Sequence, residues 1–179
     1  MPELILPDPR VQSSFLTAMK EFQAEGRGGA DDHSMLGREI SRWGGRWVDP
    51  AVFAEYTDWI RADAREGSSR PPGFVPGTTL WWADELEYLG RLTIRHRLTP
   101  ALLTLGGHIG YDIRPSARRR GHATAMLAAA LPVARGLGID PVLITCNEDN
   151  TGSRKVIEAN GGVLEDERDG MLRFWAPTG

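Results

Sequence analysis

The sequence predicts an α/β (α+β) protein with a mixed sheet, folded as one domain over residues 1–179. Three observations support this prediction. Two capped helices occupy most of the first third of the chain, a hairpin rich in β-branched and aromatic residues follows, and strands then alternate with helices. We find no internal repeat and no low-complexity linker that would separate two domains.

The first half of the chain begins with a short apolar run at residues 4–6, which is a candidate strand. Asp8-Pro9 and Asp49-Pro50 each place an N-cap residue before a proline at the first helical position. Apolar residues at helical spacing follow both pairs, so we expect one helix ending near Gly26 and another ending near Gly67. Residues 78–82 and 88–97 lie on either side of a polar turn and predict a hairpin.

The second half alternates between strands and helices after a loop at residues 99–107. The expected elements are a strand at about 108–113, a helix at 124–137, a strand at 142–146, a helix at 151–160, and strands at 164–167 and 171–175. Pro132 should bend the first of these helices. Asp169-Gly170 is a strong signal for a tight hairpin turn.

Composition excludes several classes of function. With 21 Lys and Arg against 24 Asp and Glu, the formal net charge is −3, which does not favour nucleic acid or an anionic membrane as a partner. The single Cys146 cannot form an internal disulfide, which fits a reducing cytoplasm, and the four histidines lack metal-ligand spacing. We expect no signal peptide, membrane span or metal site.

The most informative segment runs from Tyr111 to Thr124. A predicted strand leads into the loop Arg118-Arg119-Arg120-Gly121-His122-Ala123, and this loop opens directly into a predicted helix. The first N–H groups of a helix have no internal partner and carry partial positive charge, so a phosphate binds well there. Gly121 permits close approach of the backbone to a ligand, and arginines add charge-assisted donors. A basic surface loop before an amphipathic helix explains the same residues, and no P-loop or dinucleotide fingerprint is present.

Two segments in order resemble a known family. Ile113-Arg114-Pro115 followed by Arg118-x-x-Gly121-x-Ala123-Thr124 resembles the acetyl-CoA signature of the GCN5-related N-acetyltransferase (GNAT) superfamily. The strand at 142–146, Asn150-x-x-Ser153 and the following helix resemble its second cofactor segment, so the resemblance spans about residues 108–165. Residues 107–111 together with 144–147 are similar to a bacterial subgroup of predicted acetyltransferases.

This resemblance implies a GNAT-like mixed, mostly antiparallel central sheet, with helices on both faces and a splayed parallel strand pair at the cofactor site. It implies acetyl-CoA as the cofactor. Backbone groups of Tyr111 and Ile113 would pair with the pantetheine arm, and N–H groups of residues 118–124 would hold the pyrophosphate. The implied cofactor-binding residues are Tyr111, Ile113, Arg114, Arg118, Arg119, Arg120, Gly121, His122, Ala123, Thr124, Asn150 and Ser153.

The implied reaction is transfer of an acetyl group from acetyl-CoA to a primary amine of a small molecule, by direct attack in a ternary complex. The helices within residues 8–67 would shape the acceptor site, where five tryptophans either line a pocket or pack the core. Asp31, Asp32 and Glu55 are candidates for attracting a cationic amine. A non-catalytic acyl-CoA-binding or sensor domain is the alternative, a protein amine remains open as acceptor, and a homodimer is compatible with either function.

The candidate groups for proton transfer depart from the pattern of the family. Many members of the family have a tyrosine seven residues after the asparagine, where this chain has Ile157. His108 and His96 are the candidate bases, because their pKa lies near the working pH. A place in the core explains His96 equally well, because it lies on the same face of the predicted strand as Leu92. Cys146 is best explained as a small buried residue.

Overall fold

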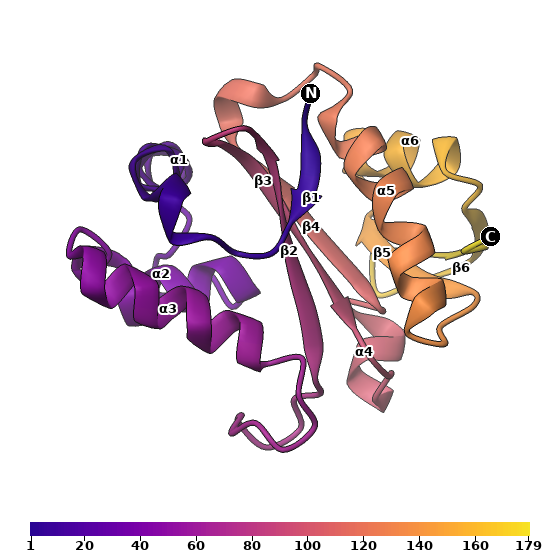
Figure 1. Ribbon diagram of the computed structural model, residues 1–179. Helices are drawn as coiled ribbons and strands as arrows, with labels where there is room; N and C mark the ends of the chain where they lie inside the picture. Colours follow the sequence, from indigo (N-terminus) through magenta and orange to yellow (C-terminus); the bar gives the residue numbers. More distant parts are fainter.

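The computed structural model describes all 179 residues and arranges their strands in two antiparallel sheets flanked by helices (Figure 1). The larger sheet has the order β1-β2-β3-β4 and the smaller one the order β5-β7-β6. The strands of the larger sheet are β1 (Glu3–Ile5), β2 (Gly77–Asp84), β3 (Glu87–Arg95) and β4 (Ile109–Ile113). Those of the smaller sheet are β5 (Val142–Asn147), β6 (Val163–Arg168) and β7 (Met171–Ala176).

Helices lie on both faces of the larger sheet, with α1 to α3 on one side and α5 and α6 on the other (Figure 1). Their bounds are α1 (Gln12–Ala24), α2 (Met35–Trp43), α3 (Pro50–Ala62), α4 (Pro100–Thr104), α5 (His122–Gly136) and α6 (Thr151–Ala159). None of them combines the length and the apolar character that a membrane span requires.

The predicted caps are present. Asp8 accepts a hydrogen bond from the N–H of Arg10 at 2.9 Å and begins a short 3-10 turn that leads into α1. Asp49 accepts one from the N–H of Ala51 at 2.8 Å and begins α3. Both carboxylates satisfy donors that the helix itself cannot.

Two helices were not predicted. Ser34 caps α2 by accepting a hydrogen bond from the N–H of Gly37 at 3.0 Å, and Leu36, Ile40 and Trp43 form its buried stripe. Within the predicted loop at 99–107, Thr99 caps the short helix α4. The helix α3 ends at Ala62, earlier than the glycine at 67 suggested.

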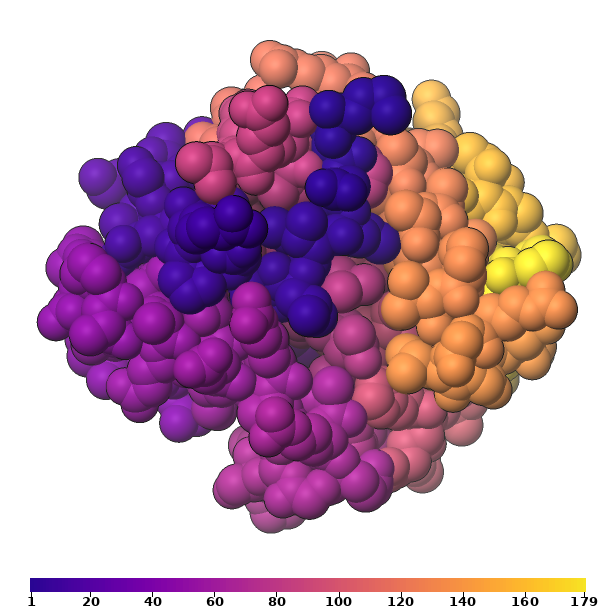
Figure 2. Space-filling model, in the orientation of Figure 1, coloured from indigo at the N-terminus to yellow at the C-terminus, as the bar shows by residue number.

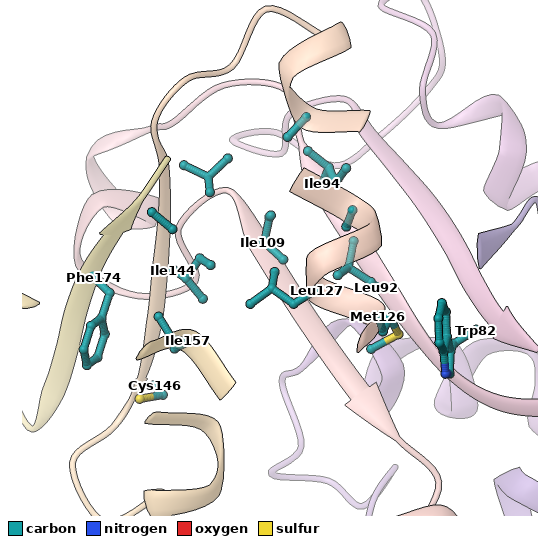
Figure 3. Packing of buried hydrophobic residues seen from close by; sticks show 14 of the residues in the cluster. Trp82, Leu92, Ile94, Ile109, Met126, Leu127, Ile144, Cys146, Ile157 and Phe174 are labelled. Carbon is teal, nitrogen blue, oxygen red and sulfur yellow. The ribbon is translucent and has the colours of Figure 1, made fainter. Parts of the chain in front are cut away.

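The two faces of the larger sheet bury separate hydrophobic clusters. Neighbouring residues on β2 point to opposite faces, so Trp82 belongs to the cluster that includes residues of β4, β5, α5 and α6, where it lies beside Met126 (Figure 3), while Trp81 packs with the aromatic residues of α1 and α3. Trp43 and Trp47 are also buried, which confirms core packing as the explanation for four of the five tryptophans, and only Trp59 reaches the surface. Figure 2 shows residues 1–70, in indigo to magenta, covering one side of the molecule and the C-terminal elements covering the other.

The prediction of a single mixed sheet was wrong in one respect, because the strands divide between two sheets and every pairing is antiparallel. The strand β5 pairs with β7 rather than with β4. The N–H of His108, just before β4, donates to the carbonyl of Leu143 on β5 at 2.8 Å. It is the one backbone hydrogen bond that joins the two sheets at this place.

Candidate active site

The loop between β4 and α5 has an unusual number of free backbone donors. The N–H groups of residues 119–124 donate no hydrogen bond within the protein, and the N–H of Arg118 turns back to Pro115 at 3.3 Å. Arg119 and Gly121 have positive φ angles of 61° and 81°, which turn successive N–H groups toward a common side. A Cβ built on Gly121 meets no atom within 4 Å, so the space beside it is open. The loop can therefore cradle an anionic group.

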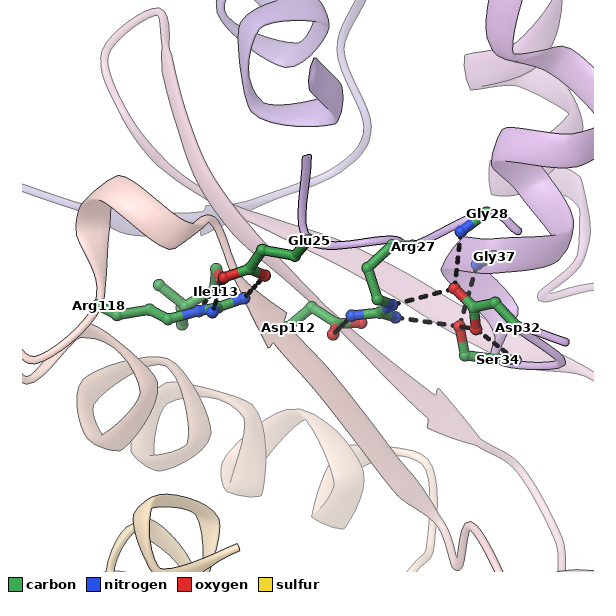
Figure 4. Close-up of polar contacts among 9 residues, drawn as sticks. All are labelled: Glu25, Arg27, Gly28, Asp32, Ser34, Gly37, Asp112, Ile113 and Arg118. Atoms are coloured by element: carbon green, nitrogen blue, oxygen red, sulfur yellow. Dashed lines mark hydrogen bonds and ion pairs between the residues drawn. The ribbon is translucent and has the colours of Figure 1, made fainter. Parts of the chain in front are cut away.

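The four arginines around this loop have two different roles. Arg118 forms a two-pronged ion pair with Glu25 at the end of α1, at 2.7 and 2.9 Å, and its Nε donates to the carbonyl of Ile113 at 3.0 Å (Figure 4). Arg114 is buried and pairs with Glu21 on α1. Arg119 and Arg120 are exposed and make no side-chain hydrogen bond. Sequence reasoning did not distinguish these two pairs.

Glu21 is held by more than one donor. The N–H and hydroxyl of Ser116 donate to it at 3.0 and 2.9 Å, in addition to the guanidinium of Arg114. Partial burial would raise the pKa of this carboxyl, but these donors and the charge of Arg114 lower the pKa to about 2. The loop is thus anchored to α1 by a carboxylate that stays ionised.

The edge of β4 that faces away from β3 is unpaired. The N–H of Arg114 donates to Leu89 at 2.9 Å, and the carbonyl of His108 accepts from Arg95 at 2.7 Å, so the even-numbered residues of β4 direct their backbone groups to β3. Those of Ile109 and Tyr111 point the other way, toward β5, and form no hydrogen bond with it. This edge can accept an extended ligand in the manner of an added strand.

The side chains of Tyr111 and Ser153 meet between β4 and α6, with their hydroxyl oxygens 2.6 Å apart. Burial raises the pKa of Tyr111 to about 12, against the opposing effect of the hydrogen bond with Ser153. Asn150 caps α6 by accepting from the N–H of Ser153 at 3.0 Å. The predicted second cofactor segment is thereby brought against the strand that carries the first. Nearby, Cys146 is buried, as expected, and burial raises the pKa of its thiol.

The remaining predicted cofactor residues line the first turn of α5. His122 accepts a hydrogen bond at Nδ1 from the indole of Trp82 at 3.3 Å. Thr124 accepts one at its carbonyl from Asn160 at 3.2 Å, which ties α5 to α6. Ala123 is half-buried and packs against the core.

The two candidate bases lie in different environments. Nδ1 of His108 accepts a hydrogen bond from the N–H of Leu143 at 2.9 Å, so the lone pair that a base would use is already occupied. Burial, and after it the charge of Arg95, lower the pKa of His108. His96 lies beyond the end of β3, where its Nε2 is 2.8 Å from the hydroxyl of Thr78, and burial lowers its pKa.

Ile157 is fully buried in the cluster shown in Figure 3. A Cβ built on Gly162 would lie 2.4 Å from its side chain, so the fit there is tight. A tyrosine ring would not fit at this position without rearrangement of the end of α6.

The opposite face of β4 is covered by α2 and by the loop before it. Arg27 in this loop pairs with Asp112 on β4 at 2.8 Å and with Asp32 at 3.1 Å (Figure 4). Asp32 also accepts hydrogen bonds from Gly28 and Ser34, so its carboxylate is fully used within the protein. Asp31 and Glu55 are exposed. A pocket of about 300 Å³ lies between the loop and α2, lined by Gly28, Gly29, Ala30, Asp32, His33, Arg38, Ser41 and Arg42.

Comparison with known proteins places these features in a family. The model of the family described as acetyltransferase (GNAT) domain matches residues 30–163. No curated protein sequence matches the chain.

Solved structures share the fold at low sequence identity. RimJ of Mycobacterium smegmatis in complex with CoA-disulfide superposes with a TM-score of 0.67 and 20% identity, over 98% of this chain and 81% of RimJ. The microcin C7 self-immunity acetyltransferase MccE, in complex with acetyl-CoA and AMP, gives a TM-score of 0.63 and 13% identity over 98% and 92% of the two chains. The ribosomal L7/L12 α-N-protein acetyltransferase RimL, in complex with coenzyme A, gives 0.60 and 16% over 97% and 92%.

The family model covers most of the chain, including the loop between β4 and α5 and the unpaired edge of β4, and it confirms the family that the sequence motifs indicate. This protein belongs to the acetyltransferase (GNAT) domain family, whose enzymes take their acyl group from acetyl-CoA.

Proposed function

We propose that this protein transfers the acetyl group of acetyl-CoA to a primary amine of a small molecule, by direct attack of the amine while both substrates are bound. The observation that carries this proposal is the run of free N–H groups at residues 119–124, directly after a strand with an unpaired edge. A pyrophosphate fits the first feature and the amides of a pantetheine arm fit the second. Both belong to acetyl-CoA.

In this proposal β4 and β5 are the splayed parallel pair that the family resemblance implies. The hydrogen bond between His108 and Leu143 holds the two strands together where they begin, and no further backbone bond joins them. The pantetheine arm would then lie between them against the backbone of Tyr111 and Ile113. Because the carbonyl of Ile113 already accepts from Arg118, Ile113 would offer its N–H group.

The pyrophosphate would bind to the N–H groups of residues 119–124, with Arg119 and Arg120 supplying charge. Arg114 and Arg118 would contribute by holding the loop against α1 rather than by touching phosphate. Residues 122–124 would contribute their backbone N–H groups, which are those of the first turn of α5. Asn150 and Ser153 would contact the arm from α6.

Proton transfer needs a donor for the departing thiolate. We propose the hydroxyl of Tyr111 for this role, since Ile157 stands where the usual tyrosine would be. With a pKa of about 12, the Tyr111 phenol is protonated at neutral pH, and Ser153 holds it by a 2.6 Å hydrogen bond. The bond from Leu143 to Nδ1 of His108 favours a positioning role for that histidine, so water would accept the proton of the amine.

The direct test is the release of free thiol from acetyl-CoA in the presence of a panel of amines, together with calorimetric titration of acetyl-CoA. Tight binding with amine-dependent thiol release supports the proposal. Binding without thiol release for any amine supports the sensor function instead. Absence of acetyl-CoA binding overturns both.

A further inference from the structure

A positively charged side chain without a counter-ion lies beside the middle of β4. Arg95, the last residue of β3, extends on the same face as Arg91 and Thr93, which is the face that Met35 of α2 contacts. A Cβ built on Gly110 would lie 3.6 Å from both Nη1 and Nη2 of Arg95. The guanidinium therefore rests directly over Gly110, on the α2 side of the strand.

The hydrogen bonds of Arg95 leave most of its donors free. Nη1 donates to the carbonyls of Gly106 and Gly107 at 3.0 and 3.2 Å, and neither Nε nor Nη2 donates to any atom of the protein. Arg91, Arg114 and Arg118 each pair with a glutamate. No ion pair includes Arg95, although it is substantially buried.

The one charge that shifts the pKa of Arg95 belongs to another cation. Burial, and after it the positive charge of Arg38 on α2, lower the pKa of Arg95. Arg38 itself stacks over the ring of Phe74 at 4.8 Å and pairs with no carboxylate. It also lines the pocket of about 300 Å³ between α2 and the loop before it. A partly buried arginine that feels a second, exposed arginine and no carboxylate is unfavourable on its own, and it becomes favourable when an anion binds to it.

In the proposed reaction, this position lies on the side of β4 that receives the acceptor. Gly110 lies between Ile109 and Tyr111, whose side chains point to the α5 and α6 face, so the opposite face at Gly110 is the one from which an amine can approach. The carboxylates on this face do not compete for the arginines, because Asp112 and Asp32 both pair with Arg27.

We propose that the acceptor is an amine that carries an anionic group, a carboxylate or a phosphate, within a few bonds of the amine, and that Arg95 with Arg38 binds this group. The proposal rests on the proposed acetyl transfer and narrows its substrate class. An arginine fork binds carboxylate and phosphate oxygens in a two-pronged geometry, whereas a polyamine would be repelled. The exposed Asp31 and Glu55 then have no part in binding the acceptor.

The first test compares acceptors in pairs that differ only in the anionic group: β-alanine with β-alaninamide, and phosphoethanolamine with ethanolamine. The expected result is that kcat/KM for thiol release is about 10- to 100-fold higher for at least one anionic member than for its neutral partner. The pair that shows the preference distinguishes carboxylate from phosphate. Equal values in both pairs, or higher values with spermidine, overturn the proposal.

The second test uses variants. Arg95→Met should raise KM for the preferred anionic acceptor about 10-fold or more and leave the affinity for acetyl-CoA unchanged, and Arg95→Lys should lie between it and the wild type. Arg97→Met is the matched control, since Arg97 is two residues further along, exposed, and paired only with Glu66. Similar effects at both positions contradict the assignment to Arg95.

A binding measurement separates this inference from the proposed reaction. N-acetyl-β-alanine and O-phospho-N-acetylethanolamine are the acetylated products, and each can be titrated against the complex with coenzyme A and compared with its neutral counterpart. Binding that depends on the anionic group and on Arg95 supports the anion site even if no amine releases thiol. If neither product binds better than its neutral counterpart, the site is not an anion site, whatever the turnover.

Discussion

The hydroxyl oxygens of Tyr111 and Ser153 lie 2.6 Å apart and join the middle of β4 to the first turn of α6. This bond connects the two halves of the cofactor segment that are separated by 42 positions in the sequence. It also holds a phenol against α6, the helix in which Ile157 stands at the position of the tyrosine common in the family.

Replacing Tyr111 by Phe should lower kcat by about 10- to 100-fold, the usual contribution of a positioned proton donor, while the affinity for acetyl-CoA changes little. Because the pKa of Tyr111 is about 12, the wild type should keep this contribution beyond pH 10 and lose it only as the pH approaches 12. The measurement is kcat against pH for both proteins. Ser153→Ala should give a smaller decrease, and an unchanged kcat in Tyr111→Phe would exclude the phenol as donor.

Replacing Gly121 by Val should abolish binding of acetyl-CoA and leave the fold in place. The new Cβ meets no protein atom within 4 Å, so the side chain would occupy the space of the ligand, and the φ of 81° adds a cost of about 2 kcal/mol for a β-branched residue. Gly138→Val is the matched control, since Gly138 has a φ of 80°, an equally open Cβ position and a place at the other end of α5. Calorimetry of both variants checks the prediction, and equal affinities would remove the pyrophosphate from this loop.

Arg119 and Arg120 should affect binding, and Arg118 should affect stability. The double replacement Arg119→Ala/Arg120→Ala removes two exposed charges that have no protein partner, so the Kd for acetyl-CoA should rise about 10-fold or more, with a weaker dependence on salt. Arg118→Ala breaks an exposed pair with Glu25 and should cost about 0.5–1 kcal/mol in the free energy of unfolding. Titrations at two salt concentrations and urea unfolding separate the two effects.

The ion pair of Glu21 should make stability depend on acid pH. Its pKa falls from 4.5 to about 2 on folding, so its contribution is complete above pH 4.5 and is lost as the pH falls through 2. Allowing for solvent screening, this contribution is about 2 kcal/mol. Urea unfolding between pH 2 and pH 7 should show that Glu21→Gln loses this dependence. Glu158→Gln, at an exposed i,i+4 pair with Arg154, should keep the wild-type slope.

The elements that could be predicted from the sequence are those whose signals are local. Asp8-Pro9 and Asp49-Pro50 mark helix starts because a cap and a proline act within one turn. The same local signal exists at Thr99-Pro100, which begins α4, and a serine cap before a helical stripe begins α2. These two helices were missed although the residues that encode them are present.

The division of the arginines could not be predicted, because it depends on tertiary contacts. Glu21 and Glu25 are 93 positions before the arginines they bind, and nothing in the loop itself shows which guanidinium will meet them. The separation of β4 from β5 could not be predicted for the same reason, since the alternation of apolar and polar residues identifies a strand but not the strand that it pairs with. The hydrogen bond to Nδ1 of His108 could not be predicted either, because its donor is a backbone N–H on another strand.

The contacts of α1 have a consequence for how two ligands affect each other. Glu21 and Glu25, one turn apart on this helix, hold the loop proposed for acetyl-CoA, and the segment that leaves the same helix carries Arg27 to the acceptor face of β4. A displacement of α1 would therefore change both surfaces at once. By thermodynamic reciprocity, if acetyl-CoA raises the affinity of the protein for the acceptor, the acceptor must raise the affinity for acetyl-CoA by the same free energy. One helix end would then couple the binding of the two substrates.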